Sequence, residues 1–132
     1  MNVGIVGSGP AGSFCAYHLA RAGCEVTVFD RYAQAWEKPC GGGVPPKVRE
    51  RFPEIMAYDG PRRSVSVGHF VSPDGIDIGL ESRAPMWVVA RRRFDGYLRQ
   101  LAKEAGATFR HQRVRKVVRQ RGMVMIRGVN ET

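Results

Sequence analysis

The chain has 132 residues, of which 43% are hydrophobic and 25% are charged, so its composition indicates one folded domain and excludes wholesale disorder. No run of about 18 apolar residues is present, which excludes a membrane-spanning helix. The formal net charge is +9, and the whole excess lies in residues 83–121, where 12 Lys and Arg face 2 Asp and Glu.

The first elements are expected within the first 30 residues. Residues 2–6 are short, β-branched and apolar, which is typical of a buried parallel strand. Residues 10–22 have helical spacing of apolar side chains, with Pro10 in the first turn and Gly23 after the end. Residues 25–29 alternate as a second strand. A β-α-β unit this short predicts a parallel pair with a right-handed crossover.

The remainder of the chain reads as short elements with one further helix. A glycine- and proline-rich loop at 39–46 precedes a short charged helix, and a Ser-Pro-Asp-Gly turn at 72–75 joins two strands. The predicted strands are 63–71, 76–80, 86–90, 107–111, 114–119 and 123–127, and the predicted helices are 46–52 and 94–105. The fold class is therefore α/β, a Rossmann-type domain whose parallel sheet is accompanied by a small antiparallel β element and is incomplete.

The strongest motif is the loop Gly7-Ser8-Gly9-Pro10-Ala11-Gly12, which follows a strand and opens a helix. Gly7 makes the tight turn, Gly9 lets the backbone approach a pyrophosphate, and Gly12 lets the helix lie close to the strand. Ser8, Pro10 and Ala11 complete the loop, and the helix N-terminus attracts the phosphates. The loop predicts binding of the ADP half of a dinucleotide.

An acid stands where the second predicted strand ends. The carboxylate of Asp30 can accept both ribose hydroxyls of an adenosine. Arg31 follows directly and suggests a contact with a 2′-phosphate, a lid over the adenine or only a surface charge, but Asp30 would repel that phosphate. NADP is therefore disfavoured as the ligand.

The three cysteines and the basic stretch permit several interpretations. Cys15, Cys24 and Cys40 fit neither a disulfide framework nor a zinc site, and without an export signal they predict reduced thiols in the cytoplasm and no bound metal. The basic stretch would suit a phosphorylated ligand or an anionic membrane surface, or it is a solvated face or packs on acidic protein. Nucleic acid is not expected, because aromatic side chains are not interleaved with the arginines.

Three segments together resemble the geranylgeranyl reductase family, FAD-dependent oxidoreductases of the glutathione reductase type. They are GSGPAGSFCAYHLARAGCEVTVFDR, the loop EKPCGGGVPPK and the segment VVARRRFDGYL. The resemblance implies reduction of carbon–carbon double bonds in a prenyl chain through FAD, with a nicotinamide (NAD(P)H) or ferredoxin as electron donor. The basic stretch would suit the diphosphate of such a substrate or peripheral contact with an anionic membrane surface.

The same resemblance implies roles for particular residues. The loop glycines would hold the FAD pyrophosphate and Asp30 the ribose, where the family more often has Glu. Arg91 would contact the cofactor near its phosphates. Cys40, Gly41 and Gly42 would approach the isoalloxazine ring, with Cys40 either at the site of reduction or a small loop residue without chemistry.

Members of the family are considerably longer and carry a second cofactor motif and a substrate domain. Residues 1–132 are thus expected to be the N-terminal portion of an FAD-binding domain, inactive alone and complemented by a C-terminal half. Two other classes remain open. One is an FAD-dependent monooxygenase or quinone-linked electron-transfer flavoprotein, and the other is a non-catalytic nucleotide-binding fragment or subunit.

Overall fold

A computed structural model describes residues 1–129 and divides the chain into two compact units. The first unit comprises Met1–Glu37 together with the chain from Asp95 onward, and the second comprises Lys38–Phe94. Each unit is described separately below. Among residues 1–129, no helix is long and apolar enough to cross a membrane.

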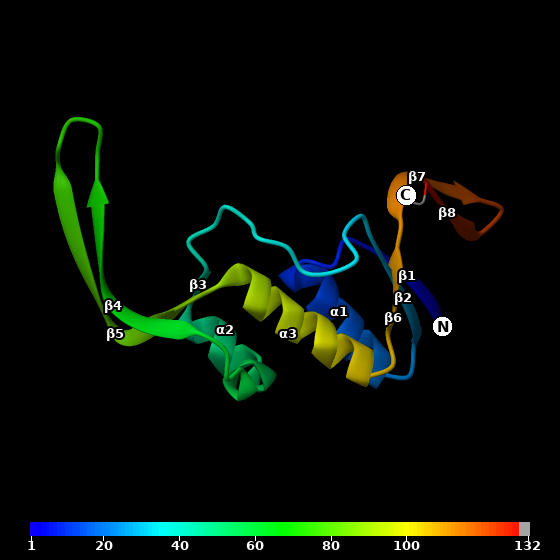
Figure 1. The fold of residues 1–132 in the computed structure, drawn as a ribbon, viewed down its shortest axis with the longest axis horizontal. Helices are drawn as coiled ribbons and strands as arrows, with labels where there is room; N and C mark the ends of the chain where they lie inside the picture. Colours follow the sequence, from blue (N-terminus) through cyan, green and yellow to red (C-terminus); the bar gives the residue numbers. More distant parts are fainter. Residues whose placement is uncertain (130–132) are drawn as a thin grey trace. The chain divides into compact units, whose positions relative to one another are not determined.

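The first unit contains a parallel sheet (Figure 1). Strands β1 (Asn2–Val6), β2 (Glu25–Asp30) and β6 (Thr108–His111) lie in the order β1-β2-β6, and both pairs are parallel. Helix α1 (Pro10–Arg21) forms the crossover between the first two strands, and Gly23 after it has a φ of 81°. The predicted β-α-β unit is confirmed.

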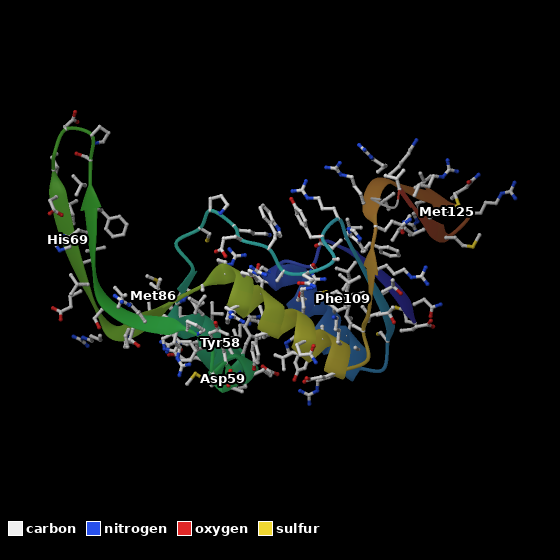
Figure 2. The ribbon with its side chains drawn as sticks, in the orientation of Figure 1. Tyr58, Asp59, His69, Met86, Phe109 and Met125 are labelled. Atoms are coloured by element: carbon white, nitrogen blue, oxygen red, sulfur yellow. The ribbon has the colours of Figure 1, made fainter. Side chains whose placement is uncertain are left out.

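Two helices cover one face of this sheet. Ala16 of α1 and Ala102 of α3 (Arg91–Glu104) are fully buried with Val26 and Val28 of β2. Phe109 of β6, labelled in Figure 2, packs against the same cluster. The predicted burial of the first strand was too high. Strand β1 lies at the sheet edge, and only its alternate residues are partly buried.

The chain after β6 forms a hairpin of β7 (Arg113–Gln120) and β8 (Met123–Val129). Its turn has positive φ at Arg121 (50°) and Gly122 (78°), the backbone that two-residue hairpins of type I′ require. Ile126 of β8 lies over Gly4 of β1, where a β-carbon would stand 2.6 Å from its Cδ1 atom. The strands predicted at 114–119 and 123–127 are therefore confirmed, and the structure pairs them as a hairpin.

The second unit is antiparallel. Strands β3 (Gly43–Val44), β5 (Asp77–Val89) and β4 (Arg62–Val71) lie in the order β3-β5-β4, and β4 and β5 form a long hairpin (Figure 1). Helix α2 (Pro46–Arg51) and the 3₁₀ helix η1 (Pro53–Ala57) precede that hairpin. Tyr58, labelled in Figure 2, packs edge-on against Phe94 at 5.2 Å between ring centroids.

Two predicted boundaries in this region were wrong. The strands expected at 76–80 and 86–90 are one strand, β5, because residues 82–85, with the proline among them, form a bulge in β5 opposite the single residue Ser66 of β4. The helix expected from 94 begins at Arg91, since the N–H groups of Arg93 and Phe94 already donate to the Ala90 carbonyl.

Candidate dinucleotide-binding site

The glycine loop between β1 and α1 is fixed by a hydrogen bond to β2 and by the close contact of α1 with β1. Gly7 turns the chain with a φ of 95°, and its N–H donates to the Phe29 carbonyl of β2 at 2.8 Å. A β-carbon on Gly12 would collide with the Gly7 carbonyl oxygen and would stand 3.4 Å from Ile5 Cγ2. The close approach of helix and strand therefore depends on a glycine at position 12.

The N-terminus of α1 has the composition of an anion site. Pro10 occupies the first turn, and the N-cap residue Gly9 has no side chain with which to cap the helix. The first N–H groups of an α-helix have no carbonyl partner within the helix, so those of Ala11 and Gly12 can donate to a ligand. Ser13 stabilises the loop, since its hydroxyl donates to the Ser8 carbonyl at 2.9 Å. A pyrophosphate fits these donors, because the helix dipole also favours negative charge here.

Asp30 lies at the end of β2 and faces this loop. Its Oδ2 atom accepts from the backbone N–H and from the hydroxyl of Ser8, both at 2.6 Å. Its Oδ1 atom accepts from the Tyr32 N–H at 2.8 Å. The sequence brings Ser8 and Asp30 to one place because parallel strands β1 and β2 end at the same edge of the sheet.

The environment of Asp30 favours its ionised form. Partial burial acts to raise the pKa of the carboxyl, but the hydrogen bonds from Ser8 and Tyr32 and the charge of Arg99 together outweigh it. The pKa of Asp30 therefore lies below its ordinary value. A carboxylate that stays charged repels a phosphate at the adenosine 2′ position, which supports a ligand with a free ribose.

Arg99 was missed by sequence reasoning. Its side chain comes from α3 and is only 6% exposed, and its Nη1 donates to the Ser8 hydroxyl at 2.9 Å. Nη2 donates to the Ala33 carbonyl at 2.8 Å. Burial lowers the pKa of Arg99, and the nearby Asp30 opposes that shift. The available signal was the helical spacing that places Arg99 beside the core residues Leu98 and Ala102.

Arg31 is exposed and lies just outside this network. The guanidinium carbon of Arg31 is 4.7 Å from the centroid of the Tyr32 ring. The backbone carbonyl oxygen of Arg31 is 2.7 Å from Nε2 of His111. The Tyr32 ring also lies 4.6 Å from the ring of Trp36. The segment after β2 thus carries adjacent aromatic faces, a surface on which a flat base can stack.

The Cys40 loop belongs to the second unit. The Gly42 N–H lies 3.4 Å from Cys40 Sγ, and Cys40 is exposed. Gly42 has a φ of 69°, and a β-carbon there would collide with the Val89 carbonyl oxygen, whereas Gly41 has open space around it. Gly42 is thus required by the backbone of its own unit, which is a structural reason for a glycine independent of any ligand.

Arg91 is the first residue of α3 and also lies in the second unit. It is followed by Arg92 and Arg93, and no acidic residue is present in the first turn. The roles proposed for Arg91 and Cys40 at a cofactor stay predictions.

Comparison with known proteins gives the same assignment. The family of NAD(P)-binding Rossmann-like domains matches residues 5–35. A geranylgeranyl diphosphate reductase from Rhodobacter capsulatus is 37% identical over 109 residues, which cover 78% of this chain and 26% of that protein. The chain thus spans about a quarter of the length of that curated relative.

Solved structures share the fold. A geranylgeranyl bacteriochlorophyll reductase-like protein from Thermoplasma acidophilum superposes with a TM-score of 0.78 at 24% identity, covering 98% of this chain and 36% of that one. A halogenase in complex with FAD superposes with a TM-score of 0.79 at 19% identity, covering 99% of this chain and 32% of that one. Identities this low show the fold alone.

The fold and the glycine loop define a Rossmann-like dinucleotide-binding chain. Within that class, the chain is similar to geranylgeranyl diphosphate reductases, over about a quarter of their length.

Proposed function

We propose that this chain binds the ADP half of FAD and is the N-terminal portion of the cofactor domain of an oxidoreductase that reduces carbon–carbon double bonds of a prenyl chain. The observation that carries the proposal is the Asp30 carboxylate, which is held ionised beside the glycine loop at the end of β2. Asp30 and the free N–H groups of α1 are the two recognition elements that an adenosine diphosphate needs.

The residues have separate tasks in this proposal. The N–H groups of Ala11 and Gly12 bind the pyrophosphate, and Asp30 accepts from the ribose. Arg91, in the first turn of α3, contacts the phosphates. Bound FAD supplies hydride chemistry, which the protein directs by orienting the cofactor. Cys40 and its glycine neighbours would lie against the flavin.

The reductase assignment is supported by the geranylgeranyl reductase relative at 37% identity, whereas halogenases share only the fold. The basic side chains of β7 would suit a diphosphate-bearing prenyl substrate or an anionic membrane surface. They are Arg113, Arg115, Lys116 and Arg119. The electron donor would be NAD(P)H or ferredoxin, and a C-terminal half would supply the second cofactor motif and the substrate pocket.

Retention of FAD tests the binding part of this proposal. The purified chain is incubated with FAD, desalted and examined for flavin absorption, with ADP added in a parallel sample as competitor. We expect flavin retained at about one per chain and displaced by ADP, because the ADP-side contacts anchor the cofactor. A colourless chain that also fails to bind ADP would overturn the assignment of this site.

Turnover tests the reductase part. Flavin reduced by NADPH or by ferredoxin under anaerobic conditions is mixed with geranylgeranyl diphosphate, with and without a C-terminal half supplied from a relative. Reoxidation of the flavin together with a hydrogenated prenyl product is the expected result with that half present. Reoxidation by oxygen or by a quinone, but not by the prenyl compound, would favour a monooxygenase or quinone-linked flavoprotein.

A further inference from the structure

The Arg99 side chain reaches the nucleotide site through a defined chain of hydrogen bonds. A guanidinium only donates, so the Ser8 hydroxyl oxygen must accept from Arg99 Nη1 and direct its own hydrogen to Asp30 Oδ2. Arg99 and Ser8 are 6% and 4% exposed, so water competes little for these bonds. The direction of the Ser8 hydroxyl is therefore fixed by a residue 91 positions away in the sequence.

Arg99 itself has little freedom to move. Nη2 is bound to the Ala33 carbonyl at 2.8 Å, and Nη1 lies 3.5 Å from the Tyr32 carbonyl. The guanidinium carbon is 5.2 Å from the centroid of the Phe109 ring, which supports it from β6. Arg99 thus ties the glycine loop, through Ser8, to the segment that follows β2.

The two oxygens of Asp30 are not equivalent as a result. A carboxylate offers about four acceptor positions, two on each oxygen. On Oδ2 both are used, by the N–H and the hydroxyl of Ser8, while Oδ1 receives, from residues 1–129, only the Tyr32 N–H. The expectation that Asp30 accepts both ribose hydroxyls does not fit this arrangement, because one acceptor position is left.

We propose that Arg99 is a positioning residue of the nucleotide site: through the Ser8 hydroxyl it occupies Asp30 Oδ2, so that Asp30 reads a single ribose hydroxyl at Oδ1. This inference rests on the proposed binding of an adenosine diphosphate. The single free acceptor position on Asp30 makes the chain specific for adenosine nucleotides that carry that one hydroxyl. The other ribose hydroxyl contributes little to affinity.

Nucleotide analogues test the proposal directly. ADP, 2′-deoxy-ADP and 3′-deoxy-ADP are titrated calorimetrically into the wild-type chain. One analogue is expected to bind within about twofold of ADP, and the other about tenfold more weakly, the usual cost of a lost hydrogen bond to a charged group. Equal weakening by both deletions would overturn the proposal while leaving the proposed function intact. Failure of ADP to bind would overturn both.

Two variants separate positioning from mere structural support. In Ser8→Ala the Oδ2 position becomes free, so both deoxy analogues are expected to bind more weakly than ADP. In Arg99→Met the Ser8 hydroxyl can rotate away, so the ratio between the two analogues is expected to fall toward one. A loss of stability alone would lower affinity for all three ligands and leave that ratio unchanged.

Lys103→Met is the matched control, because it removes one cation from the exposed side of the same helix. It is expected to keep the wild-type ratio. If Arg99→Met does not fold, the wild-type ratio and Ser8→Ala still decide the question. An unchanged ratio in a folded Arg99→Met, or unequal analogues in Ser8→Ala, would contradict the proposal.

Discussion

Strand β2 and the outer half of the β4–β5 hairpin (residues 67–71 and 77–81) have similar patterns of apolar and polar residues, but β2 is buried and the outer hairpin is exposed. Both alternate apolar and polar residues, yet Val28 of β2 is fully buried, whereas Ile78 and Leu80 of β5 are 55% and 57% exposed. Phe70 and Ile78 are a cross-strand pair, so they lie on one face of the hairpin. Alternation therefore predicts the strand, while burial depends on what packs against it.

The difference extends to the polar groups. Around the glycine loop, Ser8, Asp30 and Arg99 hold one another in a connected network next to a packed core. In the outer hairpin, the polar contact between His69 and Asp77 at 3.0 Å is exposed to solvent. Interactions of the first kind contribute to stability and to ligand geometry, and exposed pairs contribute little.

The largest expected effect comes from Gly12→Ala. The added methyl group meets the Gly7 carbonyl, so α1 must move away from β1. Overpacking against backbone costs about 3 kcal/mol, and thermal unfolding should begin about 10 °C lower, with FAD no longer retained. Gly41→Ala is the control, since nothing lies within 4 Å of its β-carbon and the melting temperature should be unchanged. A fully stable Gly12→Ala chain would refute the close helix–strand contact.

Gly42→Ala tests the same kind of contact in the second unit. The methyl group meets the Val89 carbonyl, and alanine is strained at a φ of 69° by about 1–2 kcal/mol. Only the short pairing of β3 with β5 depends on this position, so the loss is expected to be smaller than for Gly12→Ala. Hydrogen exchange should show faster exchange of the Val89 N–H, which donates to the Gly42 carbonyl, with β2 unaffected. Faster exchange throughout β2 would show that the two units unfold together.

Asp30→Asn is expected to cost about 1–2 kcal/mol at neutral pH, because an amide cannot accept all the donors that meet the carboxylate. The pKa of Asp30 is lower in the folded chain than its ordinary value of 3.8, so its contribution is complete above that pH. The contribution is lost as the pH falls through the folded-state pKa. Urea unfolding from neutral to acidic pH should therefore show the wild type and Asp30→Asn converging at low pH. A constant gap would show that ionisation of Asp30 does not stabilise the fold.

The nucleotide loop was predictable because its signals are local. The glycines, the helix start at Pro10 and the acid at Asp30 all lie within one β-α-β unit. The role of Arg99 was not predictable, because its partner Ser8 is 91 residues away in the sequence. Arg99 also lies in a stretch that contains many other basic residues. The continuity of β5 was hidden by Pro85, because a proline ordinarily interrupts a strand and is accommodated here by a bulge in β5 itself.

The smallest effect is expected for Ile78→Ala. An exposed side chain on the hairpin should change the free energy of unfolding by no more than about 0.5 kcal/mol, whereas Val28→Ala should cost about 2 kcal/mol because Val28 is fully buried. Chemical denaturation of both variants measures the contrast. If Ile78→Ala cost as much as Val28→Ala, the apolar face of the hairpin would be covered in solution. Repeating the measurement at several protein concentrations would then show whether a second copy covers it, because the cost would grow with concentration.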